Sequence, residues 1–134
     1  MSKPTLEGLH SPDGKSSTGL SENIIALLCY ILGPYTWIMG LIFYNTERSS
    51  KYVKFHAVQA MILGIIASGI WLIFLIMGIT TAFIGIGWVF MLLAWLVVTG
   101  GCLALCIYGI VTTYAKQDFV LPIIGEQAYA IVTK

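Results

Sequence analysis

The chain alternates short polar segments with long stretches that carry no formal charge. The first stretch is the 24 residues between Glu22 and Glu47. The second is the 61 residues between Lys54 and Lys116, where His56 is the only titratable side chain besides thiols and phenols. A membrane-spanning helix needs about 20 apolar residues, so the first stretch fits one crossing. As a single helix the second would be roughly 90 Å long, so it must fold back.

This pattern predicts three transmembrane helices, over residues 24–44, 52–77 and 88–114. Pro34 follows Gly33 near the middle of the first span, and a proline there removes a backbone donor and predicts a kink. Residues 78–87 contain three glycines and are predicted to form the turn between the second and third spans. The predicted fold class is all-α, an integral membrane helical hairpin or bundle of three transmembrane helices.

The two ends of the chain are not expected to cross a membrane. Residues 1–20 are polar and have no periodic apolar face, so we expect a flexible, disordered tail. Residues 119–134 are mildly apolar but interrupted by Pro122 and Gly125, so we expect an interfacial tail. The transmembrane domain is accordingly predicted to cover residues 21–134.

Composition supports a membrane protein and provides an orientation. Hydrophobic residues make up 58% of the chain and charged residues 10%, whereas a soluble domain has about 25% charged residues. With three spans, the first loop and the C-terminus share a side that holds these basic residues: Arg48, Lys51, Lys54, Lys116 and Lys134. The other side holds Lys3 and Lys15. The excess of Lys and Arg predicts that the first loop and C-terminus are cytoplasmic and the N-terminus outside.

Candidate chemistry concentrates at the start of the second span. Tyr52, His56 and Gln59 are spaced to share one helix face, and His56 lies about one turn inside the helix. One interpretation is a proton relay or a ligand contact, because polar residues inside membranes are often functional. The other is an interfacial histidine that hydrogen-bonds the C-terminal tail or the end of the first span. The lack of an acidic partner within either neighbouring span favours the second interpretation.

Arg48, Lys51 and Lys54 form a small basic cluster beside this face. It is a candidate contact for anionic lipid headgroups, although lipid-specific patches usually carry about four to eight basic residues. Ordinary positive-inside anchoring is the alternative, and the small number of charges favours it.

Small residues recur at helical spacing in the second and third spans, which predicts close helix packing. They are Ala60, Gly64 and Ser68 in the second span and Gly100 and Ala104 in the third. They either pack the spans together or dock a partner subunit.

Other chemistry is not indicated by the sequence. Cys102 and Cys106 share a helix face but have no third ligand nearby, so no metal site is predicted. Neither a cofactor-binding motif nor a catalytic Ser-His-Asp or paired-carboxylate set is present, and the net charge of +1 does not suggest nucleic-acid binding. We therefore expect a protein that is not an enzyme.

Three stretches resemble an uncharacterised family of small archaeal and bacterial membrane proteins, related to the import component of the chloroplast inner envelope (the TIC complex). They are residues 17–33, residues 47–60 with Phe55-His56-Ala57-Val58-Gln59, and residues 121–125. The resemblance covers most of the chain. It implies a helical membrane domain in a prokaryotic cell membrane, with Phe55, His56 and Gln59 as a contact motif rather than a catalytic one.

Three functions remain as hypotheses. The first is a non-enzymatic accessory or scaffold subunit that docks to a larger membrane complex or to copies of itself. The alternative is a protein-translocation or permeation component like the chloroplast relative, although the deep positions of the spans offer few polar groups. A lipid-binding module that uses the first loop is the third.

Overall fold

The computed structural model describes residues 5–114 and 119–134, without the side chains of residues 106, 110, 113 and 114. The regular secondary structure of these residues is helical, and they contain no strand beyond one isolated bridge, between Lys15 and Ser21. The helices are η1 (Glu7–Leu9), α1 (Glu22–Leu28), η2 (Gly33–Tyr35), α2 (Thr36–Thr46), α3 (Lys51–Thr81), η3 (Ala82–Ile84), α4 (Gly87–Tyr114) and α5 (Ile124–Thr133).

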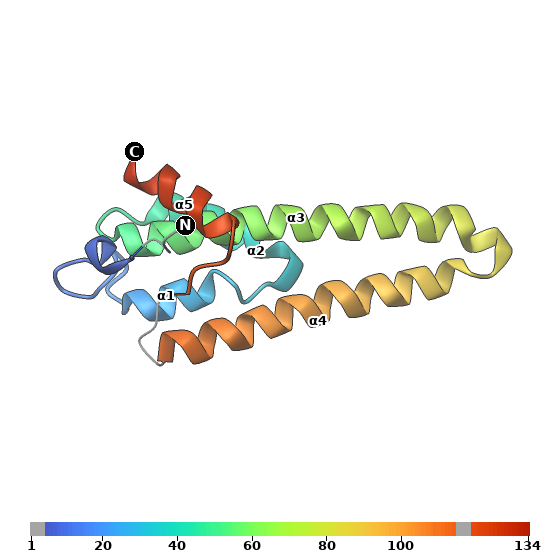
Figure 1. Cartoon of the computed structure of the whole chain (residues 1–134), viewed down its shortest axis with the longest axis horizontal. Helices are drawn as coiled ribbons and strands as arrows, with labels where there is room; N and C mark the ends of the chain where they lie inside the picture. Colours follow the sequence, from blue (N-terminus) through green and yellow to red (C-terminus); the bar gives the residue numbers. More distant parts are fainter. Residues whose placement is uncertain (1–4, 115–118) are drawn as a thin grey trace.

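The two longest helices, α3 and α4, form an extended antiparallel hairpin (Figure 1). Segments Lys51–Ile84 and Gly87–Gly109 are each long and apolar enough to cross a membrane. The turn between them is shorter than predicted, because α3 continues through Gly78 to Thr81. A helix satisfies its own backbone groups, which a glycine-rich loop in hydrocarbon would not. Gly78 is buried against Met91 of α4, so it serves the hairpin contact rather than the turn.

The first apolar stretch is not a gently kinked helix. It is divided into α1 and the η2–α2 unit, which are bent by 110° relative to each other. Gly33 has a φ of +57°, a conformation that glycine adopts without steric cost, and Pro34 follows it. By length and composition the described residues contain two membrane-crossing helices, or three if this bent pair is one span. The predicted count of three is therefore not confirmed.

The N-terminal segment differs from the expected disordered tail. Leu6 and Leu9 are buried in a cluster with Tyr52 and Phe55 of α3 and Ala128 of α5. Burial of these two leucines holds the segment against the protein, although its composition is mostly polar. Residues 5–21 thus lie folded against α3.

The C-terminal segment is also packed onto α3. Phe119 and Leu121 are buried, and α5 turns Gly125 and Ala128 inward. Ile131 on the same helix is about half exposed. The predicted interfacial tail is a short amphipathic helix in this structure.

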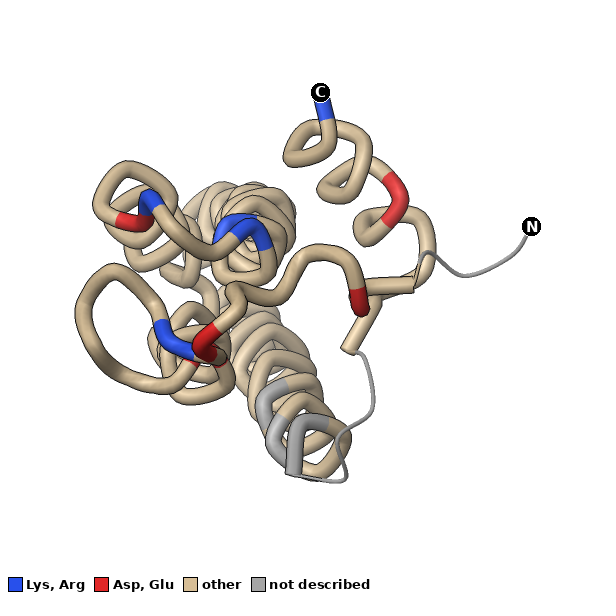
Figure 2. The backbone as a smooth tube through the Cα atoms, turned by 90° about the vertical axis from the view of Figure 1, so that its left-hand side faces the viewer, with Lys and Arg blue, Asp and Glu red and all other residues tan. Residues whose placement is uncertain are grey.

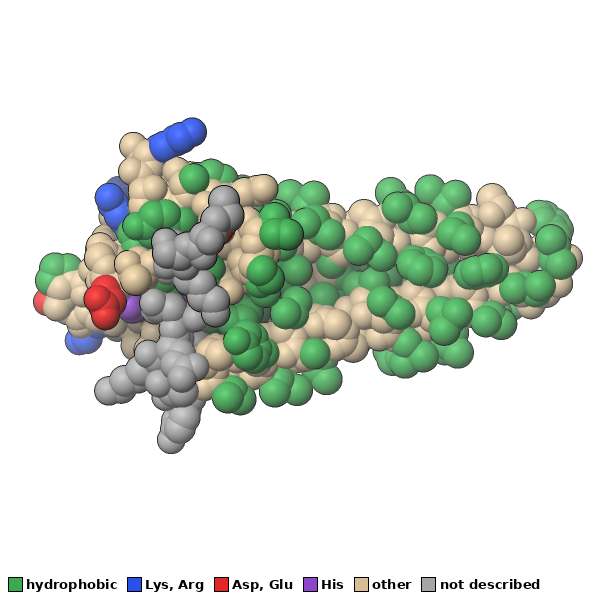
Figure 3. All heavy atoms as spheres, in the orientation of Figure 1, with side chains coloured by type: hydrophobic (Ala, Val, Ile, Leu, Met, Phe, Trp, Pro, Cys, Tyr) green, Lys and Arg blue, Asp and Glu red, His purple; other side chains and the backbone are tan. Residues whose placement is uncertain are grey.

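Polar segments gather at one end of the molecule, which we call the rim. It comprises residues 5–22, the loop 47–50, the first turns of α3, residues 119–123, and α5 with Lys134. In Figure 2 the charged residues cluster at this end, and in Figure 3 hydrophobic side chains cover the long hairpin that extends from it. The structure differs from the predicted placement of the N-terminus and the first loop on opposite sides, because hydrogen bonds join the two segments directly. That prediction assumed one full crossing between them.

Candidate functional site at the rim

Glu22, the first residue of α1, is a buried carboxylate that holds two other segments. It is 2% exposed. Its Oε2 lies 2.7 Å from His10 Nδ1, and its Oε1 accepts a hydrogen bond of 2.7 Å from the Ser11 amide. The Ser50 hydroxyl also donates to Oε1. A buried charge needs such partners, so Glu22 ties the N-terminal segment to the start of α3.

Glu47, just after α2, makes a second junction of the same kind. It is also 2% exposed. The Ser17 amide donates to both of its oxygens, at 3.0 and 3.1 Å. The amides of Ser49 and Ser50 and the Ser49 hydroxyl donate to Oε1 at 2.9–3.0 Å. Burial alone would raise the pKa of Glu47, but these hydrogen bonds outweigh it and lower the pKa to about 2.

Ser50 links the two carboxylates to α3. Its hydroxyl accepts a hydrogen bond of 3.2 Å from the Val53 amide and so caps the helix. Its own amide donates to Glu47, and its hydroxyl donates to Glu22. One buried serine therefore contacts both acidic residues.

The predicted contact motif, Phe55, His56 and Gln59, is almost completely buried. Phe55 packs in the cluster that contains Leu6 and Leu9. His56 Nδ1 lies 3.2 Å from the hydroxyl of Tyr30, which follows α1. The His56 ring stacks on Phe119 with centroids 6.3 Å apart and an interplanar angle of 6°.

Gln59 connects three parts of the chain. Its Nε2 donates to the Tyr30 hydroxyl at 2.9 Å and to the Phe119 carbonyl at 3.4 Å. Its Oε1 accepts from the Leu121 amide at 3.1 Å. The side chain thereby satisfies backbone groups of the C-terminal segment that would otherwise be buried without partners.

One atom of this network has no partner among the described residues. His56 Nε2 is buried and makes no hydrogen bond to them. Such a group is costly and is commonly tolerated for a functional or structural reason. On the other side of the Phe119 ring lies Gly109 of α4. A Cβ added at Gly109 would lie 3.6 Å from that ring, so Phe119 fills the space between His56 and α4.

The basic cluster lies at the rim surface. Arg48 and Lys51 are exposed, and Lys54 is partly buried. Lys54 Nζ lies 5.8 Å from the centroid of the Tyr44 ring, within the range of a cation–π contact. Two of the three charges therefore face the surroundings rather than the protein.

The small residues divide into two groups. Ala60 and Gly64 are buried, and Ser68 donates a hydrogen bond of 2.8 Å to the Pro34 carbonyl. This face of α3 thus receives the η2–α2 unit. Gly100 and Ala104 are exposed on α4, and a Cβ on Gly100 would meet no atom within 4 Å.

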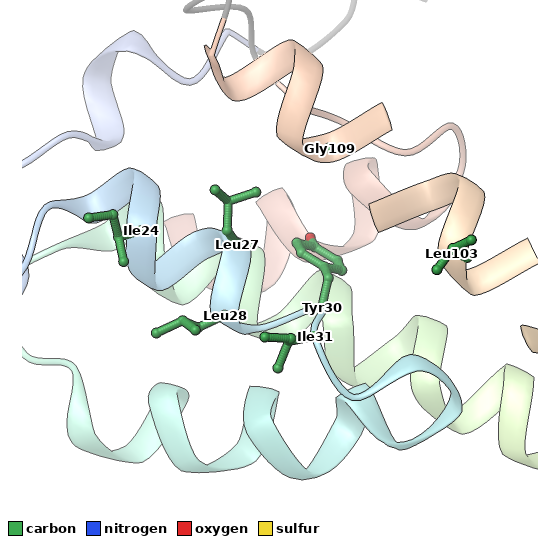
Figure 4. A pocket seen from close by; sticks show the side chains of 7 residues that line it. All are labelled: Ile24, Leu27, Leu28, Tyr30, Ile31, Leu103 and Gly109. Atoms are coloured by element: carbon green, nitrogen blue, oxygen red, sulfur yellow. The ribbon is translucent and has the colours of Figure 1, made fainter. Parts of the chain in front are cut away.

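An apolar groove of about 410 Å³ lies between α1 and α4 (Figure 4). The side chains of Leu27 and Tyr30 point toward the part of α4 that carries Gly109. Beyond α1, Gly33 of η2 approaches α4: a Cβ added at Gly33 would lie 3.8 Å from the Cβ of Cys102. The groove is lined by Ile24, Leu27, Leu28, Tyr30, Ile31, Leu103 and Gly109.

Sequence reasoning missed the two buried carboxylates as junctions, and it treated Tyr30 as a candidate interfacial or interhelical contact without identifying its partners. Several of their partners lie 26 to 30 positions away along the chain, beyond any local spacing rule. A local signal did exist: Glu47 is followed closely by two serines, and Ser16 and Ser17 precede α1. Serine hydroxyls and nearby amides are common partners of a buried carboxylate.

Comparison with known proteins provides a family-level match. Residues 21–127 match the model of the magnetosome magnetite crystal formation protein family (MamF/MmsF). A UPF0132 membrane protein of Methanocaldococcus jannaschii is 41% identical over 117 residues, which cover 86% of this chain and 92% of the relative. A UPF0132 membrane protein of Archaeoglobus fulgidus is 32% identical over 113 residues, covering 81% of this chain and 93% of the relative.

These matches support the expected resemblance to a prokaryotic membrane-protein family and a membrane location. They provide no support for its expected link to the chloroplast import component. No solved structure matches the chain.

Proposed function

This chain belongs to the magnetosome magnetite crystal formation protein family, and on that premise we propose that it is a non-enzymatic membrane scaffold whose rim docks other membrane subunits or copies of itself. The observation that carries the proposal is the construction of the rim. Glu22, Glu47 and Gln59 each join segments that are distant in sequence through buried hydrogen bonds. Such satisfied networks rigidify a surface, and a rigid surface suits docking.

The rim is proposed to face the cytoplasm. The residues between Lys54 and Lys116 carry no formal charge, so the α3–α4 turn contributes neither Lys nor Arg to the opposite side. The rim carries Lys15, Arg48, Lys51, Lys54 and Lys134. The positive-inside rule therefore favours a cytoplasmic rim.

Within the membrane, association between copies or with a partner subunit is proposed to use a second surface, on α4, in addition to the rim. Gly100 and Ala104 leave an exposed face with small side chains, and such faces let transmembrane helices approach closely. The family description concerns magnetite crystal formation. A scaffold that organises proteins on one membrane face would fit a role of that kind.

Native mass analysis of the protein purified in mild detergent tests the scaffold. We expect a particle larger than the 14.7 kDa chain, from further copies or from a co-purifying subunit. Gly100→Leu should reduce the fraction of that particle at least about fivefold, since leucine blocks close helix approach. Gly69→Leu is the matched control, because a Cβ there also meets no atom within 4 Å. A monomer without any partner would contradict the proposal.

The alternative is a translocation or permeation component, for which His56 and Gln59 would be expected to line a polar path. In the described structure both side chains are buried in an internal network, and the groove beside Tyr30 is apolar. Flux through proteoliposomes that His56→Ala or Gln59→Ala alters would favour this alternative over the scaffold.

The basic cluster is proposed to contact anionic headgroups at the cytoplasmic surface. Arg48 and Lys51 are exposed there, and each basic residue near such a surface contributes about 1 kcal/mol. Replacing both with Glu should weaken the association of the detergent-free protein with anionic lipid nanodiscs relative to neutral ones. An unchanged preference would exclude a lipid role for these two residues.

A further inference from the structure

Both ends of the α1–α2 pair lie at the rim. Glu22, at the start of α1, is hydrogen-bonded to Ser50, and Glu47, after α2, is hydrogen-bonded to Ser17. The bend between the two elements is 110°, so the chain turns back rather than continuing. Figure 1 shows α1 leading away from the rim and α2 returning to it beside α3.

The turn of this pair lies partway along the hairpin. Pro34 accepts a hydrogen bond from Ser68, and Gly33 approaches Cys102. Ser68 is 17 residues from the start of α3 and 13 from its end. The far part of the hairpin therefore extends well beyond the turn, as Figure 1 also shows.

The depth of the pair matches one leaflet. With 11 residues, α2 is about 16 Å long at 1.5 Å per residue. Half of a hydrocarbon core of 30 Å is about 15 Å. The pair is also apolar on its surface, because Ile24, Ile31, Leu32, Ile38, Leu41 and Ile42 are each exposed by a third or more. These side chains suit contact with acyl chains rather than water.

We propose that α1–α2 is a re-entrant wedge in the rim-side leaflet, and that the protein therefore prefers and promotes curved membrane with the rim on the convex face. The rim-side leaflet holds four helical segments, α1, α2, α3 and α4, whereas the opposite leaflet holds α3 and α4. At a helix diameter of about 10 Å, two extra helices occupy about 160 Å² more area in one leaflet. Unequal area between leaflets is relieved by bending, as it is for shallow amphipathic helices. This activity is independent of the scaffold proposal and needs no partner subunit.

The first test uses the unmodified protein and neutral phosphatidylcholine, so that the basic cluster does not contribute. The protein is reconstituted into vesicles of two sizes, about 50 nm and about 400 nm in diameter, and protein per lipid and sidedness are measured. We expect at least about twofold enrichment in the small vesicles, because shallow insertion is sensitive to curvature. We also expect the rim outward in most small vesicles, detected by trypsin cleavage near Lys51. Equal density and random sidedness would overturn the proposal.

The second test displaces the wedge. A Cβ at Gly64 would collide with the Trp37 backbone and with the Thr36 hydroxyl, the latter at 2.6 Å. Gly64→Leu should therefore push α1–α2 away from α3 and reduce the enrichment in small vesicles by at least half. Gly69→Leu, on the same helix with open space around it, should keep the full enrichment. Equal enrichment in a folded Gly64→Leu protein would contradict the wedge, and if that variant fails to fold, the measurement on the unmodified protein decides.

Discussion

At the scale of single residues, Glu22 and Glu47 hold the segments of the rim together. Both are acidic side chains at the boundary of apolar segments, and both are 2% exposed. Each accepts hydrogen bonds from at least two separate parts of the sequence. Removing one partner of such a network leaves the others buried without a hydrogen bond, which costs more than the bond itself contributes.

Glu47→Gln should lower the stability of the folded protein. The glutamine side chain keeps one acceptor oxygen but loses the negative charge. Its NH2 group is a donor, and it would face the Ser17 and Ser50 amides, which are donors too. We expect a loss on the order of 1 to 3 kcal/mol, measured by thermal unfolding in detergent micelles. Glu126→Gln is the control, since Glu126 is exposed on α5. Equal unfolding temperatures for the two variants would contradict the role given to Glu47.

The contribution of Glu47 should also depend on pH. Its pKa in the folded protein is about 2, below the ordinary value of 4.5. A carboxylate whose pKa is depressed by folding stabilises the folded state above its unfolded pKa and loses that effect as pH falls. The difference between wild type and Glu47→Gln should therefore be full above about pH 5 and shrink between pH 4.5 and 2. A difference that stays constant across this window would exclude the carboxylate as its cause.

Gln59 should control the C-terminal segment. Gln59→Leu removes the acceptor of the Leu121 amide and the donor to Phe119 and Tyr30. We expect the Leu121 amide to exchange with solvent deuterium at least about tenfold faster, equivalent to a loss of about 1.4 kcal/mol. Gln127→Leu, at an exposed position on α5, should leave that exchange rate unchanged. Protection of Leu121 in Gln59→Leu would show that other contacts hold the segment.

At the scale of elements, the packing of α2 against α3 depends on a close approach of their backbones. A Cβ on Gly40 would lie 2.5 Å from the Ala57 carbonyl oxygen and 2.7 Å from Met61 Cγ. Thr36 adds a hydrogen bond of 3.0 Å to the Ala60 carbonyl on the same face. The helices can therefore pack only where one of them lacks a side chain.

Gly40→Leu should accordingly destabilise the α2–α3 contact by about 1 to 3 kcal/mol, the usual cost of overpacking. Thermal unfolding followed by helical circular dichroism measures it. Gly69→Leu on the outer side of α3 adds the same side chain in open space and should change the midpoint little. A similar fall in both variants would point to a general effect of leucine rather than to this contact.

The sequence predicted some elements well because their signal is local. Charge-free length required the α3–α4 fold-back, and helical spacing placed Tyr52, His56 and Gln59 on one face, where the structure has them buried together. The reversal at Gly33-Pro34 could not be distinguished from a kink, since both leave the same apolar run. The burial of residues 5–21 could not be predicted either, because two leucines in a polar segment have apolar partners only after α3 and α5 have folded beside them.

At the scale of the whole molecule, polarity is distributed very unevenly. The rim carries the described charges, whereas the far turn presents apolar and aromatic side chains such as Phe83, 98% exposed, and Trp88, 80% exposed. Trp is favoured at membrane interfaces, where its ring meets both acyl chains and headgroups. The hairpin is thus expected to reach the opposite interface without extending far beyond it.

The most direct test of this account is the sidedness of the two chain ends relative to the first loop. Single cysteines introduced as Asp13→Cys, Lys51→Cys, Lys134→Cys and Phe83→Cys are labelled with a membrane-impermeant maleimide in sealed vesicles of known orientation, with the unmodified protein as background. We expect Asp13→Cys, Lys51→Cys and Lys134→Cys to be labelled from the same side and Phe83→Cys not from that side. Labelling of Asp13→Cys from the side opposite Lys51→Cys would show that the first apolar stretch crosses the membrane, and it would contradict both the shared rim and the wedge.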